Sequence, residues 1–544
     1  MKKPSLLLGA LVGLLLAPPL IVVFAIGNAL AGLAFAPFDL FDWTARTLPG
    51  PVITFGIDSM VGIIRGLNLG PTDTTAKLAE QAMAIGVAVG LSAVFGALFF
   101  ALMNRLGGKD STLPGLIVGA VIGIPLLLVS LDVNPDSAAD PLVAALWIVG
   151  LSVVWGMALQ SIYQRLAMPA ASASETNRVS AEAIDRRSFL IRVGGSAAVI
   201  TVIGAGVSAF LGRDSGSGQA VAQAGNAVLP DGLPNASDSV EPAPGTRPEI
   251  TPVEDHYRID IRTTPLVIAA EGYTLPFTTR IGSDSDTTLT TMTLDEIRAY
   301  PATDAYITMS CISNPIAGDL ISTTRWTGVS FQQLLADMAI PEGATHLKIT
   351  SGDGFDETLA LDWIAADERI MLAYDWDGQP LTAEHGFPLR IHVPDLYGMK
   401  QPKWITNIEF ISGDEDGYWV RRGWDKVARV RTTSVIDTVY TRAITETPDT
   451  TVIPIGGIAW AGARGLSAVE VRVDGGDWIP AQLRAPISDR TWQLWRFDWE
   501  FSEGAHTFEV RALEADGTPQ IEDRAGVRPS GATGLHSARE RIAL

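Results

Sequence analysis

The chain has 544 residues, enough for a membrane region and two ordinary domains, and its mean hydropathy is positive (+0.23) although its net charge is −20. Apolar and charged residues are therefore segregated: residues 1–244 hold 13 Lys and Arg against 16 Asp and Glu, and residues 245–544 hold 27 against 44. A C-terminal part this acidic argues against nucleic acid as a partner, because phosphates attract Lys and Arg.

The first part of the chain contains apolar stretches that are long enough to cross a bilayer as helices, which takes about 20 residues each. Four such stretches cover residues 6–35, 82–103, 116–131 and 142–162, and a fifth candidate covers residues 189–211. Residues 53–67 are only semi-apolar and predict an interfacial helix. We therefore expect a membrane region of four to five transmembrane helices over residues 1–211, in contact with lipid.

The distribution of basic residues in the loops predicts the orientation of these helices. Eight basic residues fall on one side, namely Lys2, Lys3, Arg105, Lys109, Arg165, Arg178, Arg186 and Arg187. Only Arg46, Arg65 and Lys77 fall on the other side. The N-terminus is therefore expected in the cytoplasm of a multi-pass cell-membrane protein. With five spans, everything after residue 211 is extracytoplasmic.

No His or Cys precedes His256 in the sequence. The helices of the membrane region therefore lack the usual axial ligands of a transmembrane haem. Anchoring is the favoured role, and docking of a second membrane subunit is the alternative. Residues 185–190 (Asp-Arg-Arg-Ser-Phe-Leu) resemble a twin-arginine export signal, which carries folded proteins with their cofactors; simple positive-inside anchoring is the alternative. Residues 212–250 predict a flexible linker, and Ala-Val-Ala at 220–222 leaves open whether the fifth helix is cleaved.

Cys311 is the only cysteine of the chain, so it cannot form an intrachain disulfide or build a cysteine-rich zinc or iron–sulfur site. A thiol used on its own is either a catalytic nucleophile or the single protein ligand of a soft metal whose other ligands come from a cofactor. A small buried cysteine that only fills space is the structural alternative.

Residues 251–428 alternate short β-rich runs, turns and a few helical stretches, which predicts an α+β domain. Strands are expected over residues 346–350, 370–374, 389–393 and 404–411, and helices over residues 293–300 and 330–338. Ser330 is expected to cap the second helix, with Gln333 as its capping-box partner.

Four segments of this domain carry distinctive motifs in a fixed order. They are His-Tyr-Arg-Ile-Asp at 256–260, Cys-Ile-Ser-Asn-Pro at 311–315, His-Gly-Phe-Pro-Leu-Arg at 385–390 and Tyr-Gly-Met-Lys-Gln-Pro-Lys-Trp at 397–404. In this order they resemble the sulfite oxidase family of molybdopterin-dependent oxidoreductases, over residues 255–544. In that family one molybdopterin dithiolene, oxo groups and one protein thiolate hold the molybdenum, so the resemblance implies that Cys311 is the metal ligand.

The resemblance also implies roles for the polar residues of these motifs. Tyr257, Arg258 and Lys400 are expected near the metal as catalytic residues, although the family often has Arg where Lys400 stands, which leaves the substrate anion open. The residues expected to bind the cofactor are Tyr257, Arg258, Asn314, Thr323, Arg325, His385, Arg390, Lys400 and Lys403. Surface solvation of the cations and ordinary turn roles for Asn314 and His385 are the alternatives.

Residues 429–544 contain alternating runs at 453–460, 468–473, 476–482, 493–499 and 506–512, separated by Gly, Asp and Pro, which predicts an all-β sandwich. Motifs such as Gly-Gly-Ile-Ala-Trp at 456–460 resemble the immunoglobulin-like dimerisation domain of the same family. A homodimer contact is therefore its implied role, with passive stabilisation as the alternative. The predicted fold class is thus a helical membrane region, an α+β molybdopterin domain and an immunoglobulin-like sandwich.

We accordingly expect an extracytoplasmic oxidoreductase that transfers an oxygen atom to a small oxyanion such as sulfite. The chain has no haem-attachment motif or iron–sulfur ligand set, so electrons are expected to pass to a separate carrier, for which a cytochrome is the natural candidate. Reductive transfer from a sulfoxide or nitrate is the first alternative. A cofactor-free binding or assembly protein and a Cys311 nucleophile assisted by His385 or His392 also stay open.

Overall fold

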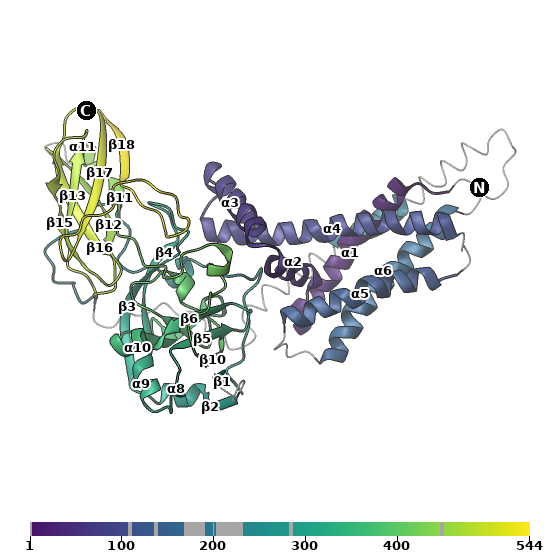
Figure 1. Cartoon of the computed structure of the whole chain (residues 1–544). Coiled ribbons are helices and arrows are strands. Elements are labelled where there is room, and N and C mark those ends of the chain that lie inside the picture. Colours follow the sequence, from purple (N-terminus) through teal and green to yellow (C-terminus); the bar gives the residue numbers. More distant parts are fainter. Residues whose placement is uncertain are drawn as a thin grey trace. The chain divides into compact units, whose positions relative to one another are not determined.

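The computed structural model describes residues 3–106, 111–134, 140–167, 191–199, 201–202, 232–281, 287–446 and 451–543 (Figure 1). The chain divides into two compact units. Unit 1 comprises Met1–Leu48, Thr75–Val221 and Ile261–Thr264, and unit 2 comprises Pro49–Thr74, Ala222–Asp260 and Pro265–Leu544. The twin-arginine-like stretch, most of the fifth candidate span and residues 212–231 of the linker lie outside the described residues.

Among the residues that the structure describes, four helices are long and apolar enough to cross a membrane, as the sequence predicts. They are α1 (Leu6–Ala31), α4 (Thr72–Leu106), α5 (Leu113–Val133) and α6 (Pro141–Ala167). Small residues allow close packing of these helices: a Cβ at Gly13 of α1 would collide with the Ser92 carbonyl of α4, and a Cβ at Gly156 of α6 with the Gly115 carbonyl of α5. Such contacts are typical of helices packed in a bilayer.

Unit 1 also contains a buried polar cluster that the sequence did not predict. It is built on α2 (Ala36–Thr47), where Asp39 accepts a hydrogen bond from Ser130 Oγ at 2.7 Å and Asp42 accepts one from the Thr263 amide at 3.0 Å. Lys77 Nζ donates to the Arg262 carbonyl at 2.9 Å. The short segment Ile261–Thr264 is thereby held by side chains of the helical unit, although the residues on either side of it belong to unit 2.

Unit 2 begins with α3 (Gly50–Gly66), which confirms a helix where the sequence predicted an interfacial one. The larger part of unit 2 is an α+β domain with two sheets, of which the first is mixed and the second is antiparallel throughout. One has the order β2-β1-β10-β5-β6, and the other the order β3-β4-β7-β8 with β9 beside β7. The strands are β1 (Thr274–Thr279), β2 (Thr287–Thr293), β3 (Ala302–Ser310), β4 (Ile321–Ser330), β5 (His346–Ser351), β6 (Asp356–Ala360), β7 (Met371–Trp376), β8 (Gln379–Pro380), β9 (Arg390–His392) and β10 (Ile405–Ile411).

Short helices connect these strands. They are η1 (Val253–Asp255), α8 (Leu294–Arg298), α9 (Phe331–Ala336), α10 (Leu361–Ala366), η2 (Ala383–His385), η3 (Gly398–Lys400) and η4 (Val420–Arg422). The predicted capping box at Ser330 is wrong: its side chain makes no cap hydrogen bond, and its buried oxygen has no partner among the described residues. The box forms at α8, where Thr293 and Glu296 cap each other. Ser330 still ends β4, so its backbone is held by the sheet.

The C-terminal domain is a sandwich of two four-stranded sheets, as predicted. Their orders are β11-β12-β16-β15 and β14-β13-β17-β18. The strands are β11 (Thr433–Val439), β12 (Val452–Trp460), β13 (Leu466–Val473), β14 (Ile479–Pro480), β15 (Gln482–Leu483), β16 (Gln493–Glu500), β17 (Gly504–Glu514) and β18 (His536–Ile542), with the short helix α11 (Ala443–Glu446) between β11 and β12. Ile453, Val469, Trp495 and Phe508, drawn from both sheets, form one buried core. The predicted fold class, a helical region followed by an α+β and an all-β domain, is confirmed.

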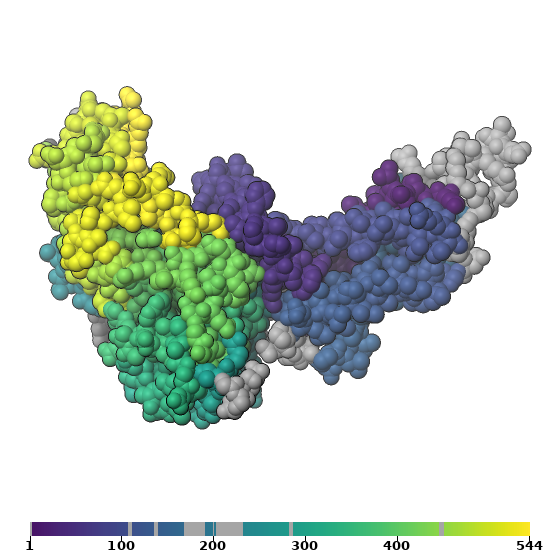
Figure 2. Space-filling model, in the orientation of Figure 1, coloured from purple at the N-terminus to yellow at the C-terminus, as the bar shows by residue number. Residues whose placement is uncertain are grey.

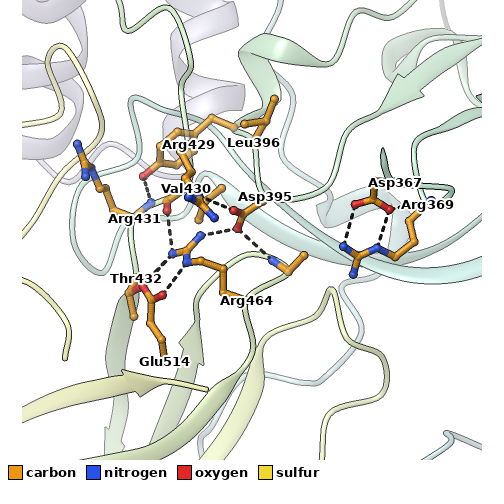
Figure 3. A network of polar contacts seen from close by, with 12 residues as sticks. Asp367, Arg369, Asp395, Leu396, Arg429, Val430, Arg431, Thr432, Arg464 and Glu514 are labelled. Carbon is orange, nitrogen blue, oxygen red and sulfur yellow. Dashed lines mark hydrogen bonds and ion pairs between the residues drawn. The ribbon is translucent and has the colours of Figure 1, made fainter. Parts of the chain in front are cut away.

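A polar network joins the two domains of unit 2, whose surfaces adjoin in the space-filling view in green and yellow (Figure 2). Arg464 is its centre (Figure 3). Its guanidinium forms ion pairs with Asp395 of the α+β domain and with Glu514 of β17, the latter at 2.8 Å, and donates to the Val430 carbonyl at 3.0 Å. One arginine thus ties the end of the α+β domain to the sandwich.

Candidate functional site

Cys311 is the first residue after β3, in the loop that leads to β4. The Cys311 amide donates to the Leu320 carbonyl at 3.0 Å, and the Leu320 amide donates to Asn314 Oδ1 at 3.0 Å. The side chain of Asn314 therefore closes the loop, and the strand pairing of β3 with β4 fixes both of its ends. Cys311 is buried, with only 8% of its surface exposed, and its sulfur lies 3.1 Å from Ser313 Oγ.

Tyr257, Tyr397 and Arg65 each interact electrostatically with the Cys311 thiol. Burial raises the pKa of Cys311, and the hydrogen bond with Ser313 and the positive charge of Arg65 oppose that rise. Burial also raises the pKa of Tyr257, and the charge of Cys311 adds to the effect. The Tyr257 amide is held by Ser322 Oγ of β4 at 3.0 Å, which places the phenol beside the Cys311 loop.

A cluster of three cations forms where the 256–260 segment meets the 385–390 and 397–404 segments. Asp260 accepts from Arg258 Nε at 2.7 Å and from Lys403 Nζ at 3.2 Å. Arg390 is buried, and its Nη1 donates to the His385 carbonyl at 3.0 Å. Burial lowers the pKa of Arg390 to about 10 and that of Lys403 to about 8, in the latter case against the attraction of Asp260. Two of the three cations pair with the one carboxylate, so the cluster keeps a net positive charge, which favours a bound anion.

Aromatic rings line the same region. His256 and His385 meet edge to face with ring centroids 5.0 Å apart, and Trp376 lies 4.5 Å from His385. The guanidinium of Arg390 lies over the Trp326 ring at 4.9 Å. Burial lowers the pKa of both histidines, that of His256 to about 3, so both rings are neutral at neutral pH. They can donate or accept hydrogen bonds but add no charge.

Several buried polar atoms of this region have no hydrogen-bond partner among the described residues. They are Thr324 Oγ1, Arg325 Nε, Arg258 Nη2 and His256 Nε2. A buried donor left without a partner costs about 1–3 kcal/mol, so such atoms point to a ligand that supplies the missing acceptors. A polar, phosphate-bearing cofactor fits this set, because it offers anionic acceptors to the cations and further acceptors to the neutral donors.

The structure brings some of the sequence-predicted site residues together and leaves others apart. Tyr257 lies near Cys311. Arg258, Arg390 and Lys403 form the cation cluster, and the His385 carbonyl accepts a hydrogen bond from Arg390. By contrast, the Thr323 hydroxyl is hydrogen-bonded to that of Thr308, and Asn314 closes its own loop. Lys400 Nζ donates to Glu357 Oε1 at 2.6 Å. Arg325 follows Thr324 in β4, and its amide donates to Asp377 Oδ1 at 3.3 Å.

Sequence reasoning missed Arg65, Glu357, Trp326 and Trp376 as parts of the site. Arg65 is more than 240 residues away from Cys311 in the sequence and was counted only as a loop cation. Glu357 carries no motif, and the pairing of β10 with β5 and of β5 with β6 brings it to Lys400. Among the described residues no group of three or more His, Cys, Asp or Glu side chains could hold a metal ion. A molybdenum site held by a cofactor and one protein thiolate would use Cys311, the single cysteine of the chain.

Residues 264–419 match the family model of the "Oxidoreductase molybdopterin binding domain". Mitochondrial sulfite oxidase of Mus musculus is 27% identical over 248 residues, which cover 38% of this chain and 45% of that protein. NADH nitrate reductase 1 of Oryza sativa is 24% identical over 300 residues, which cover 42% of this chain and 32% of that protein. The chain thus spans less than half the length of these relatives.

Among solved structures, the sulfane dehydrogenase SoxCD of Paracoccus pantotrophus aligns with 59% of this chain and 96% of its own, at 17% identity and a TM-score of 0.46, a score below the level that establishes a shared fold. The family match and the sulfite oxidase relatives agree with the donor set around Cys311. Together they identify residues 264–419 as a molybdopterin-binding oxidoreductase domain.

Proposed function

We propose that the protein is a membrane-anchored, extracytoplasmic oxidoreductase that transfers an oxygen atom to a small oxyanion such as sulfite. The observation that carries this proposal is the combination of a single buried thiol with a cluster of cations and unpartnered donors, which Tyr257 links because both Cys311 and Arg390 act on its hydroxyl. The thiol suits a soft metal, and the cations suit the phosphate of a pterin. Similarity to sulfite oxidases favours the oxidative direction.

The roles of the residues follow from their positions. Molybdopterin, when bound, supplies a molybdenum centre that exchanges an oxygen atom and two electrons with the substrate. Cys311 ligates that metal as the thiolate, and Arg258, Arg390 and Lys403 bind the phosphate end of the pterin. Thr324, Arg325 and the neutral rings of His256 and His385 supply hydrogen bonds to the pterin. The Tyr257 hydroxyl would donate a hydrogen bond to a ligand beside Cys311.

Oxidation of sulfite to sulfate takes the oxygen atom from water and releases two protons and two electrons. A separate electron carrier, for which a cytochrome is the candidate class, must accept the electrons. The C-terminal sandwich is proposed to be an immunoglobulin-like dimerisation domain. A homodimer would contain two such sites. Light scattering of the detergent-solubilised protein would measure its molecular mass and so show whether it is a dimer.

The proposed location rests on the apolar helices of unit 1 and on α3. The exposed apolar side chains of α3 include Val52, Phe55 and Ile63, whereas Asp58 forms an ion pair with Arg528. A helix with one apolar and one polar face suits the membrane surface. A periplasmic reporter enzyme fused after residue 250 should be active, and one fused after residue 107 should be inactive. The reverse pattern would contradict an extracytoplasmic domain.

Reductive oxygen-atom transfer is the second candidate, and the similarity to a plant nitrate reductase favours it. The two directions differ in the partner that the enzyme requires. Sulfite with an artificial electron acceptor tests oxidation, and nitrate or a sulfoxide with a reduced dye tests reduction. Activity in only the second assay would replace the first proposal by the second.

The decisive experiment is purification from native membranes followed by metal and cofactor analysis. We expect molybdenum and molybdopterin in amounts equal to the protein, and sulfite-dependent reduction of the acceptor. The Cys311→Ser variant should lose both the molybdenum and the activity. A native protein that is folded but free of molybdenum would instead support a binding or assembly role for the same fold.

A further inference from the structure

Residues 49–74, which link the first two candidate spans, belong to the same compact unit as the oxidoreductase domain. The contacts are distributed along the whole segment. Asp58 of α3 pairs with Arg528 at 3.3 Å, and the Thr72 amide donates to Asp319 Oδ2 at 2.6 Å. Asp73 Oδ2 accepts from the Arg258 amide at 2.9 Å. Residues 49–74 are therefore held by the Cys311 loop, which contains Asp319, and by the 256–260 segment, which contains Arg258.

Arg65, in the last turn of α3, lies within this fixed segment. Its Nη2 is buried and has no hydrogen-bond partner among the described residues. Burial lowers the pKa of Arg65, and the negative charges of Asp319 and Cys311 oppose that change. The described groups that face the guanidinium are thus the carboxylate of the Cys311 loop and the metal-ligand candidate itself. A buried guanidinium nitrogen with no acceptor calls for an anionic ligand.

Lys400, the cation that the motif places near the metal, has a different environment. Its Nζ is bound by Glu357 Oε1 at 2.6 Å, and the two side chains are 4% and 2% exposed. The pair is neutral as a whole and shielded from solvent, so its attraction for a substrate anion is small. A protein that binds an oxyanion beside Cys311 therefore needs another positive charge there.

We propose that Arg65 is this charge: it binds the anionic group of the substrate beside Cys311, and the segment between the first two spans thereby completes the substrate site. The proposal rests on the proposed function, since it names the residue that recognises the oxyanion. Arg suits the task because its planar fork donates two parallel hydrogen bonds to an oxyanion. The membrane region then contributes substrate specificity as well as anchoring.

The test compares Arg65→Gln and Arg65→Lys with the wild-type protein in the membrane-extracted holoenzyme. For sulfite, we expect Arg65→Gln to raise KM at least about tenfold, the loss expected for one charged hydrogen bond, with a much smaller change in kcat. Arg65→Lys should recover part of the affinity, because it keeps the charge without the fork. Molybdenum content should be unchanged in both variants.

A binding measurement without turnover gives the second readout. Sulfate, an inert oxyanion, should raise the melting temperature of the wild-type protein by mass action and should have a much smaller effect on Arg65→Gln. Arg528→Gln is the matched control, because it removes an arginine that holds α3 but leaves the charge of Arg65 in place. This control should keep the wild-type KM and the sulfate effect.

The outcomes separate this inference from the proposed function. A wild-type protein with molybdenum but no oxygen-transfer activity on any anion would overturn the proposed function, whatever Arg65 does. A wild-type enzyme that oxidises sulfite, with unchanged KM and sulfate stabilisation in Arg65→Gln, would overturn the role of Arg65 alone. An equal loss in Arg65→Gln and Arg528→Gln would show that Arg65 only holds α3 in place and would also overturn it.

Discussion

Lys400 and Glu357 form a buried ion pair with 2.6 Å between Nζ and Oε1. Glu357 lies in β6. Lys400 is the last residue of η3, within the 397–404 motif that precedes β10. Burial raises the pKa of Glu357, and the charge of Lys400 opposes the rise, so the carboxylate depends on its partner to stay ionised. A Cβ at Gly417 would collide with this carboxylate, which shows how tightly the pair is enclosed.

We predict that Lys400→Met destabilises the protein by about 3–5 kcal/mol, because it leaves an uncompensated buried carboxylate. The free energy of unfolding, measured by urea titration of the purified protein, checks this. The control is Asp416→Asn, which removes the exposed pair with Lys426 and should cost about 1 kcal/mol or less. Equal losses in the two variants would mean that the Lys400 pair is not buried in solution.

Cys311 should be protected from alkylation in the holoenzyme and reactive after the cofactor has been removed. A thiolate bound to a metal is less nucleophilic because it shares its electron density with the metal, whereas a free thiol is modified once local motion exposes it. Because Cys311 is the only cysteine of the chain, one mass shift in the intact protein reports the reaction. Rapid alkylation of a fully molybdenum-loaded enzyme would favour a nucleophilic thiol instead.

Lys403 predicts a pH dependence of anion binding by the cofactor-free protein. Its pKa is lowered to about 8 by burial, so the ammonium loses its proton as the pH rises through 8. The affinity for inorganic pyrophosphate, measured by calorimetry, should therefore fall by about tenfold between pH 7 and pH 9. Lys403→Gln should bind weakly at pH 7 and show a flat profile over the same range.

The lowered pKa of Lys403 also predicts how the free energy of unfolding changes with pH. Between pH 8 and the ordinary lysine value of 10.5, the unfolded chain holds the proton that folded Lys403 has lost. The contribution of Lys403 to the free energy of unfolding therefore increases with pH across that window, while anion binding decreases. Comparison of wild type with Lys403→Gln isolates this contribution. An identical pH dependence in both proteins would show that Lys403 is not buried as described.

Arg464 should determine whether the α+β domain and the sandwich unfold together. Arg464→Met removes the partner that Asp395 and Glu514 share, and we expect a loss of about 1–3 kcal/mol and a split of one unfolding transition into two. Differential scanning calorimetry measures both effects. Arg472→Met serves as the control, because its pair with Glu509 lies within one sheet of the sandwich and should cost about 1 kcal/mol or less.

Much of this protein was predictable from local pattern. Apolar stretches of sufficient length predicted the four long helices, and alternating residues predicted strands such as β5 and β10, because local periodicity reflects which face of an element is buried. The motifs around Cys311 and His385 pointed to the candidate cofactor site, because the residues of each motif are neighbours in one loop or at one strand end. The capping of α9 was wrong, because the identity of a residue does not fix the direction of its side chain.

The sequence by itself thus determined the order of the domains, the single thiol and the cations of the candidate cofactor site. Only the tertiary structure decided which charges neutralise one another. It pairs Lys400 with Glu357 through sheet register and brings Arg65 to Cys311 through the docking of residues 49–74. The sequence shows which charged side chains the chain has. Binding of an anion, however, depends on which of these charges stays without an opposite partner at the site. That balance is set by contacts between residues far apart in the chain.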